Sequence, residues 1–309
     1  EFVERHFGRE LLERVADPML AGIYGGEAER LSARAALPRF VELERKHGSL
    51  IKAMQGARRT PQGSSAAIFT SLRSGMGELI EALVKKLDAK NLHLNQNIET
   101  LSRRGKKWIC TRNGSQEFEA VIVALPAWVA AKLLASESSE LAQALAKVRY
   151  TSSMTVALGF DGKAIERAKP LPPGFGFLVP RGEGRRLLAC TLVHNKFPHR
   201  APGGSHLVRL FFGGARDESA LSLSDVEAIS LARRELREIT GFDAAPDLAR
   251  VWRWPRAMAQ YDVRHLELVK EIERPAQKLP GLALAGNAYH GVGIPDCIRG
   301  GRDAAQHLL

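Results

Sequence analysis

The chain has 309 residues, of which 45% are hydrophobic and 26% are charged. These values are typical of globular proteins, and they exclude a miniprotein, a wholly disordered chain and a low-complexity chain. Lys and Arg number 45 against 34 Asp and Glu, which gives a formal net charge of +11 and favours anionic partners. The basic residues are scattered along the sequence, so the charge does not indicate a nucleic-acid-binding tail.

The cysteine pattern and the hydropathy exclude several further classes of protein. Cys110, Cys190 and Cys297 form no Cys-x-x-Cys pair, so the sequence predicts neither a disulfide framework nor a zinc clip, and it favours a reducing compartment. No apolar run approaches the roughly 20 residues that a membrane-spanning helix needs, and no signal-peptide pattern opens the sequence. Because the sequence opens with Glu1 inside a helical pattern, we expect it to be a piece of a longer polypeptide.

The first part of the chain is predicted to be mainly helical. Hydrophobic residues recur at intervals of three or four over residues 2–54, and a glycine-rich stretch at 21–26 interrupts them. That stretch either lets the backbone approach another part of the molecule closely or forms a simple turn between helices. Residues 56–66 predict an exposed loop, residues 79–87 an amphipathic helix and residues 91–95 a strand.

A β-hairpin is predicted next. An Asn113-Gly114 turn separates two strand-like segments, residues 108–111 and 118–123. The continuous apolar run 121–125 is typical of a strand that is covered on both faces.

Strand-like alternation and helical periodicity then follow each other to the end of the chain. The alternating segments predict an antiparallel sheet, and a Ser-Asp-x-Glu cap marks the start of one long helix. A buried strand, a glycine-rich turn and a helix come last. The predicted strands are 153–160, 176–179, 187–193, 207–212 and 282–285, and the predicted helices are 127–134, 140–148, 224–240 and 296–309.

The glycine-rich turn at residues 286–293 is a candidate binding site. Its backbone amides and the positive end of the following helix dipole favour a phosphate or the anionic edge of a ring. A tight strand-to-helix connection explains the same glycines equally well. No Gly-x-Gly pair is completed to Gly-x-Gly-x-x-Gly and there is no Walker loop, so a classical nucleotide-binding start is absent from this sequence.

The sequence contains no strong catalytic or metal-binding pattern. It has no His-Glu-x-x-His, no Gly-x-Ser-x-Gly and no closely spaced carboxylate pair in an apolar setting. His194, His199 and His206 are near one another, but intervals of five and seven residues suit no metal-binding helix face. We therefore predict no metal site and assign no catalytic acid or base.

Five segments carry a family resemblance. They are DPMLAGIYGG at 17–26 with LS at 31–32 and LP at 37–38, SGMG at 74–77, VALPA at 123–127, GFGFLVP at 174–180, and AGNAYHGVGIPDCI at 285–298. In this order they resemble the oxygen-dependent protoporphyrinogen oxidase family within the flavin amine oxidases. The resemblance extends over essentially the whole chain, and several segments are specific to that family.

The resemblance implies a mixed fold of the α+β and α/β classes. Its parts are a partial, Rossmann-like FAD-binding domain of the amine-oxidase type, an antiparallel-sheet substrate domain and a helical segment that faces the membrane. Family members begin with a Gly-x-Gly-x-x-Gly turn that holds the FAD pyrophosphate. We therefore expect the N-terminal FAD-pyrophosphate region to be missing and the fragment to be inactive alone. The expected boundaries are 1–66 for the helical segment bordering the substrate channel, 67–135 for the middle of the FAD-binding domain, 136–278 for the substrate domain and 279–309 for the C-terminal part of the FAD-binding domain.

The resemblance also implies an activity. The family comprises flavoenzymes of haem biosynthesis that use FAD and O2 to convert protoporphyrinogen IX, or coproporphyrinogen III, to the porphyrin. In such enzymes the flavin takes the hydride from a methylene bridge, so no residue is assigned a catalytic role. Two alternatives stay open: another flavin amine oxidase or phytoene desaturase-like oxidoreductase, and a non-catalytic tetrapyrrole-binding protein.

Binding residues are carried over from the family position by position. Without the resemblance, the aromatic and aliphatic residues among the substrate positions are better explained as ordinary strand core. The positions that match FAD contacts are Ile98, on the adenosine side, and Gly286, Asn287, Gly291, Val292, Gly293 and Ile294, on the flavin side. The positions that match the tetrapyrrole pocket are Gly22, Phe175, Leu178, Thr191 and Phe211.

The resemblance predicts a porphyrinogen and O2 as partners, and no nucleic acid. It places the protein in the cytoplasm, with peripheral contact between the helical segment and the inner face of the cell membrane. The net charge of +11 agrees with attraction to anionic lipid, although solvated helix faces explain the basic residues as well. A homodimer is a further expectation.

Overall fold

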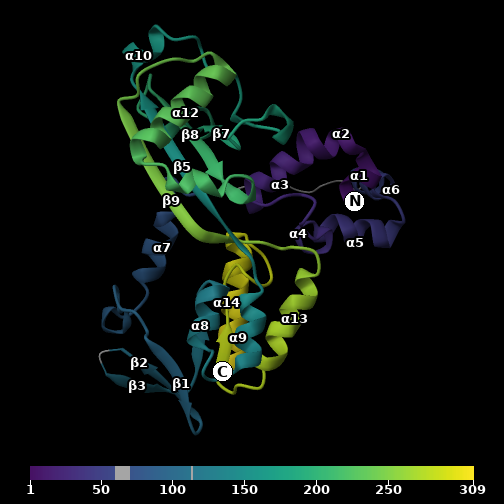
Figure 1. The fold of residues 1–309 in the computed structure, drawn as a ribbon, viewed down its shortest axis with the longest axis vertical. Coiled ribbons are helices and arrows are strands. Elements are labelled where there is room, and N and C mark those ends of the chain that lie inside the picture. The colour runs from purple at the N-terminus through teal and green to yellow at the C-terminus, as the bar shows by residue number, and fades with distance from the viewer. Residues whose placement is uncertain (60–69, 113) are drawn as a thin grey trace.

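The computed structural model describes residues 1–59, 70–112 and 114–309. A five-stranded antiparallel sheet with the strand order β6-β7-β8-β5-β9 forms its upper half (Figure 1). This confirms the predicted antiparallel sheet. The sequence patterns did not identify β9, whose alternation is interrupted by Pro255. The strands are β5 (Tyr150–Phe160), β6 (Gly176–Leu178), β7 (Ala189–Leu192), β8 (His206–Gly213) and β9 (Leu248–Ala259).

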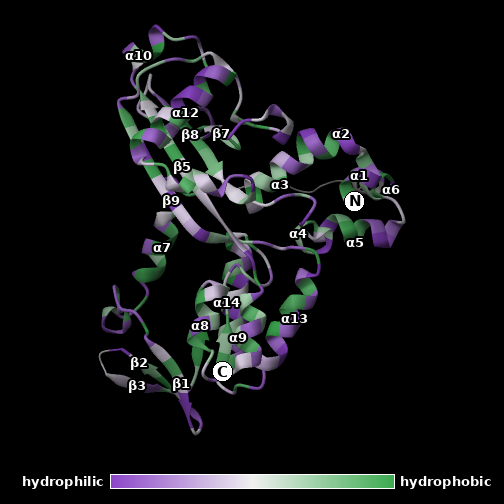
Figure 2. Cartoon of the chain, in the orientation of Figure 1, coloured by the Kyte–Doolittle hydropathy of each residue, from purple (hydrophilic) through white to green (hydrophobic). Residues whose placement is uncertain are grey.

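One face of this sheet is buried under α12 (Asp225–Thr240). Alternate residues of β5 and β8, such as Val156, Leu158 and Phe212, point into this core and are fully buried. Figure 2 shows the resulting hydrophobic stretches along these strands. The predicted cap starts the helix, because the Ser224 hydroxyl accepts from the Glu227 N–H while the Glu227 carboxylate accepts from the Ser224 N–H. The opposite face of the sheet is therefore the one available for binding.

A second core surrounds a short parallel pair, β4 (Val121–Val123) and β10 (Leu282–Leu284). The helices around it lie in the lower half of Figure 1. The expectation that β4 is covered on both faces is wrong, since the helices bury Val123 while Ile122 is 41% exposed. These helices are α8 (Ala127–Leu133), α9 (Ser139–Ala146), α13 (His265–Ala276) and α14 (Ile294–Leu308).

The predicted hairpin is present as part of a small antiparallel sheet. Trp108 on β2 pairs with Phe118 on β3, while the turn residue Asn113 lies outside the described residues. The expected single strand over 118–123 is wrong. It is split because β3 pairs with β2 whereas β4 pairs with β10. The strands are β1 (Thr100–Arg104), β2 (Lys107–Thr111) and β3 (Ser115–Phe118).

Two other local predictions differ from the structure. The strand expected at 91–95 is instead a short 3-10 helix, η2 (Ala89–Asn91), followed by irregular chain, because no strand of the described residues pairs with this segment. Alternation without a partner strand does not hold a strand in water. The loop expected from residue 56 starts later, since α6 (Leu50–Arg59) continues to residue 59. Residues 60–66 of that loop lie outside the described residues.

The N-terminal part is helical, as predicted, and lies beside the sheet (Figure 1). Within the described residues, no helix is both long enough and apolar enough to cross a bilayer. The N-terminal helical part consists of α1 (Phe2–Phe7), α2 (Arg9–Leu11), η1 (Leu12–Ala16), α3 (Asp17–Tyr24), α4 (Ala33–Ala36) and α5 (Pro38–His47), followed by α6. The other helices are α7 (Gly77–Val84), α10 (Gly162–Glu166), α11 (Val193–Lys196), η3 (Arg181–Glu183), η4 (Pro198–Arg200), η5 (Gly214–Arg216) and η6 (Glu218–Ser222).

The glycine-rich stretch at the end of α3 makes the close approach that its composition allows. The Gly25 carbonyl accepts a hydrogen bond of 2.7 Å from the N–H of Ala215. A Cβ atom at Gly214 would lie 2.8 Å from the same carbonyl oxygen. The buried ion pair between Asp17 and Arg216 joins the two segments a second time. These contacts attach the helical part to the end of β8.

The contact at Gly214 can be tested with a matched pair of substitutions. Gly214 and Gly204 have similar backbone angles, φ +69° and φ +77°, but a Cβ at Gly204 would meet nothing within 4 Å. Gly204→Ala should lower the free energy of unfolding by the left-handed backbone cost alone, about 1–2 kcal/mol. Gly214→Ala should cost about 1–3 kcal/mol more through steric overlap. Urea denaturation measures both; equal losses would contradict a tight contact at Gly25.

Candidate functional site

The turn between β10 and α14 is shaped by two glycines with positive φ. Gly286 has φ +126° and Gly291 has φ +147°. A Cβ at Gly291 would lie 2.4 to 2.5 Å from side-chain atoms of Asp296, so only glycine lets the turn fold over the start of the helix. A Cβ at Gly286 would meet only the Leu125 carbonyl, at 4.0 Å. The turn is therefore tightly folded at its helical end and open beside β4.

Tyr261 holds this turn from beneath. Its hydroxyl donates to the Asn287 carbonyl at 3.0 Å and accepts from the Gly291 N–H at 2.7 Å. Its ring stacks on His265 at a centroid distance of 3.8 Å, and His265 Nε2 donates to the Tyr289 carbonyl at 3.1 Å. Two side chains that the sequence analysis did not single out thus fix three carbonyl or amide groups of the turn.

Burial sets the protonation of both supporting side chains. It raises the pKa of Tyr261 well above its ordinary value, so the hydroxyl keeps the proton that it donates to Asn287. It lowers the pKa of His265, whose side chain is almost fully buried. Both groups are therefore neutral near pH 7, and the turn rests on uncharged hydrogen bonds.

Several backbone N–H groups of the turn make no hydrogen bond within the described residues. In residues 1–59, 70–112 and 114–309, no carbonyl or side chain accepts from the N–H groups of Val292 or Gly293. The N–H of Ile294 is also free, because it opens α14, one residue earlier than Pro295. Asp296 in the first helical turn offsets part of the positive dipole, but Arg299 pairs with its carboxylate. This set of donors suits the carbonyl oxygens of a ring edge.

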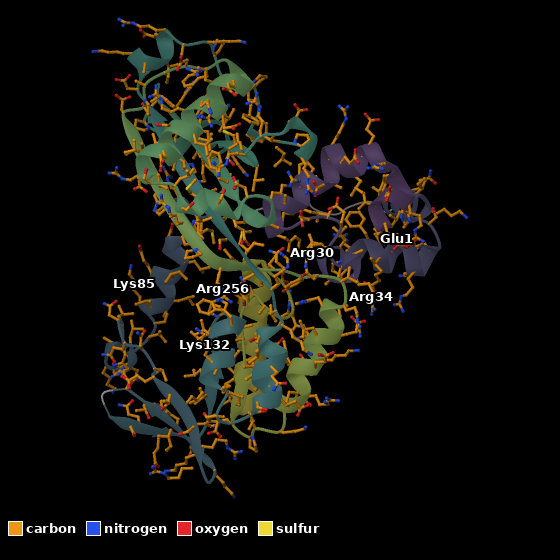
Figure 3. The ribbon with its side chains drawn as sticks, in the orientation of Figure 1. Glu1, Arg30, Arg34, Lys85, Lys132 and Arg256 are labelled. Carbon is orange, nitrogen blue, oxygen red and sulfur yellow. The ribbon has the colours of Figure 1, made fainter. Side chains whose placement is uncertain are left out.

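Cationic side chains lie beside the turn at the junction of β9 and α8. The amide of Asn287 reaches the Ala257 carbonyl at 3.5 Å. The adjacent Arg256, which has the unusual backbone angle φ +47°, stacks its guanidinium 4.3 Å from the ring centre of Trp128. The ammonium of Lys132 lies 5.6 Å from the same ring, and Figure 3 labels both cations at this junction. No sequence pattern indicates this cluster, since Arg256 is more than 120 positions from Trp128 and Lys132 and none of the three belongs to a motif.

The substrate positions predicted from the family fall largely on the open face of the sheet. Directly opposed residues of an antiparallel sheet share a face. Leu178 opposes Ala189, and Ala189 opposes Phe211. Gly22 of α3 lies against the same face, since a Cβ there would be 3.7 Å from Leu178. Three predicted positions from three distant segments are thus brought together.

The remaining predicted positions are placed less closely. Thr191 is on the same face, two residues along β7 from Ala189. Phe175 lies just before β6 and is 66% exposed. Its carbonyl accepts a hydrogen bond from the N–H of Leu192, and the Leu192 side chain belongs to the core on the other face of the sheet. Ile98 lies between η2 and β1, is 43% exposed, and is not in the core cluster against which Val292 packs. The described residues therefore do not join Phe175 or Ile98 to the other positions.

A cavity lies on the open face of the sheet. Its volume is about 420 Å³, and its walls include Ala157, Leu207, Arg209, Trp252 and Trp254. Thr155 pairs with both Phe211 and Trp252, so the cavity continues the row of residues that holds Leu178 and Phe211. An apolar surface with few polar groups is typical of a site for a flat organic ligand.

Comparison with known proteins places these features in a family. The family model for flavin containing amine oxidoreductases matches residues 1–309. The chain belongs to this family. The matched region includes both the β10–turn–α14 unit and the five-stranded antiparallel sheet.

Several named proteins align with this chain over all or nearly all of its length. Coproporphyrinogen III oxidase of Bacillus subtilis is 34% identical, and the alignment covers 100% of this chain and 66% of that protein. Chloroplastic protoporphyrinogen oxidase of rice is 28% identical, with 100% and 62% covered. A crystal structure from Exiguobacterium sp. 255-15, provisionally named a protoporphyrinogen oxidase, has a TM-score of 0.85 at 28% identity, with 99% and 65% covered. The chain thus spans about two thirds of the length of these relatives.

The support that Tyr261 gives the turn can be tested without any ligand. Tyr261→Phe removes one donor and one acceptor, and we expect a loss of about 1–3 kcal/mol in the free energy of unfolding. Amide hydrogen exchange over residues 287–293 should become faster. Tyr24→Phe is the control for the loss of a tyrosine hydroxyl next to Tyr261, because within the described residues the Tyr24 hydroxyl donates to the Ala36 carbonyl and makes no hydrogen bond with the turn, while its ring, 5.9 Å from that of Tyr261, is kept. Unchanged exchange in Tyr261→Phe would contradict the assigned role.

The lowered pKa of His265 makes a pH prediction with a definite sign. The unfolded chain has a histidine pKa near 6.5 and binds a proton that the folded chain resists, so stability falls as the pH drops below about 6.5. His265→Gln should flatten this loss, which urea denaturation between pH 7.5 and about 5 would measure against the exposed-site control His93→Gln. Parallel pH profiles for wild type and His265→Gln would refute the prediction.

Proposed function

We propose that this chain is the major part of an FAD-dependent oxidase of haem biosynthesis, which converts coproporphyrinogen III or protoporphyrinogen IX to the porphyrin with O2 as acceptor. The observation that carries the proposal is the open sheet face, where Gly22, Leu178 and Phe211 meet beside an apolar cavity. The relatives named coproporphyrinogen III oxidase and protoporphyrinogen oxidase support the same substrate class.

The turn at residues 286–294 fits the pyrimidine edge of a flavin. The free N–H groups of Val292, Gly293 and Ile294 suit its carbonyl oxygens, and Gly286 leaves open space beside β4. Asn287 would stay oriented by Tyr261 and Ala257. When bound, FAD supplies the hydride acceptor for the methylene bridge of the substrate. On the resemblance alone, Ile98 is proposed to contact the adenosine side.

The sheet face would position the substrate without taking part in proton transfer. Leu178 and Phe211 offer an apolar surface for the macrocycle, Gly22 lets α3 approach closely, and Thr191 lies at the polar side of this surface. On the resemblance alone, Phe175, which lies just before β6 and apart from the other predicted positions, is proposed as a further ring contact. Excluding water from this surface strengthens the ligand's polar contacts at its edge.

Peripheral contact of the helical segment with the inner face of the cell membrane is part of the proposal. Exposed hydrophobic side chains recur every four residues along α1 to α3, and Arg9 and Arg14 lie among them. Such a stripe with neighbouring cations suits an anionic lipid surface. The stripe consists of Phe7, Leu11, Val15, Met19 and Ile23.

The full-length protein that contains this chain provides the decisive experiment. We expect it to purify as a yellow protein that releases FAD on denaturation and turns coproporphyrinogen III or protoporphyrinogen IX into a fluorescent porphyrin, with hydrogen peroxide formed. Gly291→Ala should weaken FAD binding by at least tenfold, about 1.4 kcal/mol, because its Cβ would overlap Asp296.

Gly301→Ala is the control for that substitution. Gly301 lies in the same helix, and a Cβ there would meet nothing within 4 Å, so FAD content should be unchanged. A full-length protein that binds no flavin, or that binds flavin and oxidises neither porphyrinogen, would contradict the proposed function.

A further inference from the structure

Two arginines near the open sheet face have no carboxylate partner among the described residues. Arg209 is an exposed residue of β8 that lines the cavity, and its guanidinium makes no ion pair or hydrogen bond within that part of the chain. Arg200 bonds only the Ser71 hydroxyl and the Leu72 carbonyl, and its Nε is buried without a partner. Partial desolvation against the sheet and, to a smaller extent, the charge of Arg200 lower the pKa of Arg209.

The positive charges of Arg209 and Arg200 repel each other, and no carboxylate of the described residues compensates them. A guanidinium keeps its charge at any ordinary pH, so the repulsion is not relieved by loss of a proton. An anion placed between or beside the two groups would relieve it, and carboxylates match the donor geometry of arginine. The arrangement therefore indicates an anionic ligand.

The position of Arg209 within the sheet defines what kind of anion fits. Its neighbours across the strands are Thr191 and Ala157. The adjacent row, two residues along each strand, is largely apolar and consists of Leu178, Ala189, Phe211, Thr155 and Trp252. Two residues of a strand span about 7 Å. A ligand that lies on the apolar row would thus place a short acidic side chain at Arg209.

We propose that Arg209, supported by the charge of Arg200, binds a carboxylate of the substrate and anchors the flat ring on the sheet. This rests on the proposed function, because porphyrinogens are apolar rings whose edge carries propionates. A ring lying against Phe211 directs a propionate toward Arg209 and the Thr191 hydroxyl. Arg209 is then a binding residue and takes no part in hydride transfer.

The test uses the full-length protein and two readouts. Binding of coproporphyrin III is followed by quenching of Trp252 and Trp254, which line the cavity. Arg209→Gln should raise its Kd about ten- to a hundredfold and reduce the salt dependence of Kd. In turnover with coproporphyrinogen III, KM should rise by a similar factor while kcat changes by less than about twofold.

Two further variants separate charge from structure. Arg209→Lys keeps a cation at the site and should recover part of the affinity. Arg233→Gln removes the same charge from the exposed side of α12, which packs on the other face of the sheet, and should leave Kd and KM unchanged. FAD content equal to wild type in Arg209→Gln shows that the fold is kept.

The outcomes distinguish this inference from the proposed function. Porphyrin binding that weakens in Arg209→Gln, in a protein that oxidises no porphyrinogen, supports the anchor and contradicts the oxidase. Oxidation with the same Kd, KM and salt dependence in wild type and Arg209→Gln overturns the anchor and leaves the oxidase standing. A wild-type protein that binds no porphyrin overturns the anchor as well.

Discussion

The hydroxyl of Tyr261 is the interaction on which the candidate flavin turn depends. It is buried, and both of its hydrogen-bonding capacities are used, one on the Asn287 carbonyl and one on the Gly291 N–H. A buried hydrogen bond of this kind is costly to lose, because the partner group is left without water. The backbone carbonyl of Tyr261 also accepts from the Ser32 N–H at 2.8 Å, so the same residue joins the helical segment to the turn.

The helical segment and the sheet form the second part of the site, and small residues determine how closely they meet. Gly25 and Gly214 bring two backbones into contact, while the buried pair of Asp17 and Arg216 requires that contact to be kept. Gly22 consequently lies on the sheet face beside Leu178. The same geometry that anchors α3 thus closes one side of the surface on which a ring could lie.

Sequence patterns predicted the elements whose signal is local. The capping box of α12, the hairpin around Trp108 and the final strand, turn and helix were all identified, because each depends on neighbouring residues. The strand expected at 91–95 was wrong and β9 was missed, because pairing with distant strands decides both.

The candidate site likewise combines residues that local sequence patterns indicate with residues that only the folded chain brings together. The glycines of the turn are readable in the sequence, whereas its supports, Tyr261 and His265, lie more than 20 positions away and look like ordinary core residues. The family resemblance supplied Leu178 and Phe211, which periodicity alone assigns to the core. The family resemblance did not indicate Arg209. Its position beside the apolar row and its lack of a carboxylate partner among the described residues become visible only in the assembled sheet.

The parallel pairing of β4 with β10 has a consequence for how the protein folds during synthesis. Leu282 pairs with Val121, which are 161 positions apart (282 − 121), and the whole antiparallel sheet lies between them in the sequence. Bringing such distant segments together costs chain entropy and slows folding. The sheet and α12 can therefore assemble on the ribosome first, whereas the lower core can close only after β10 has left the exit tunnel.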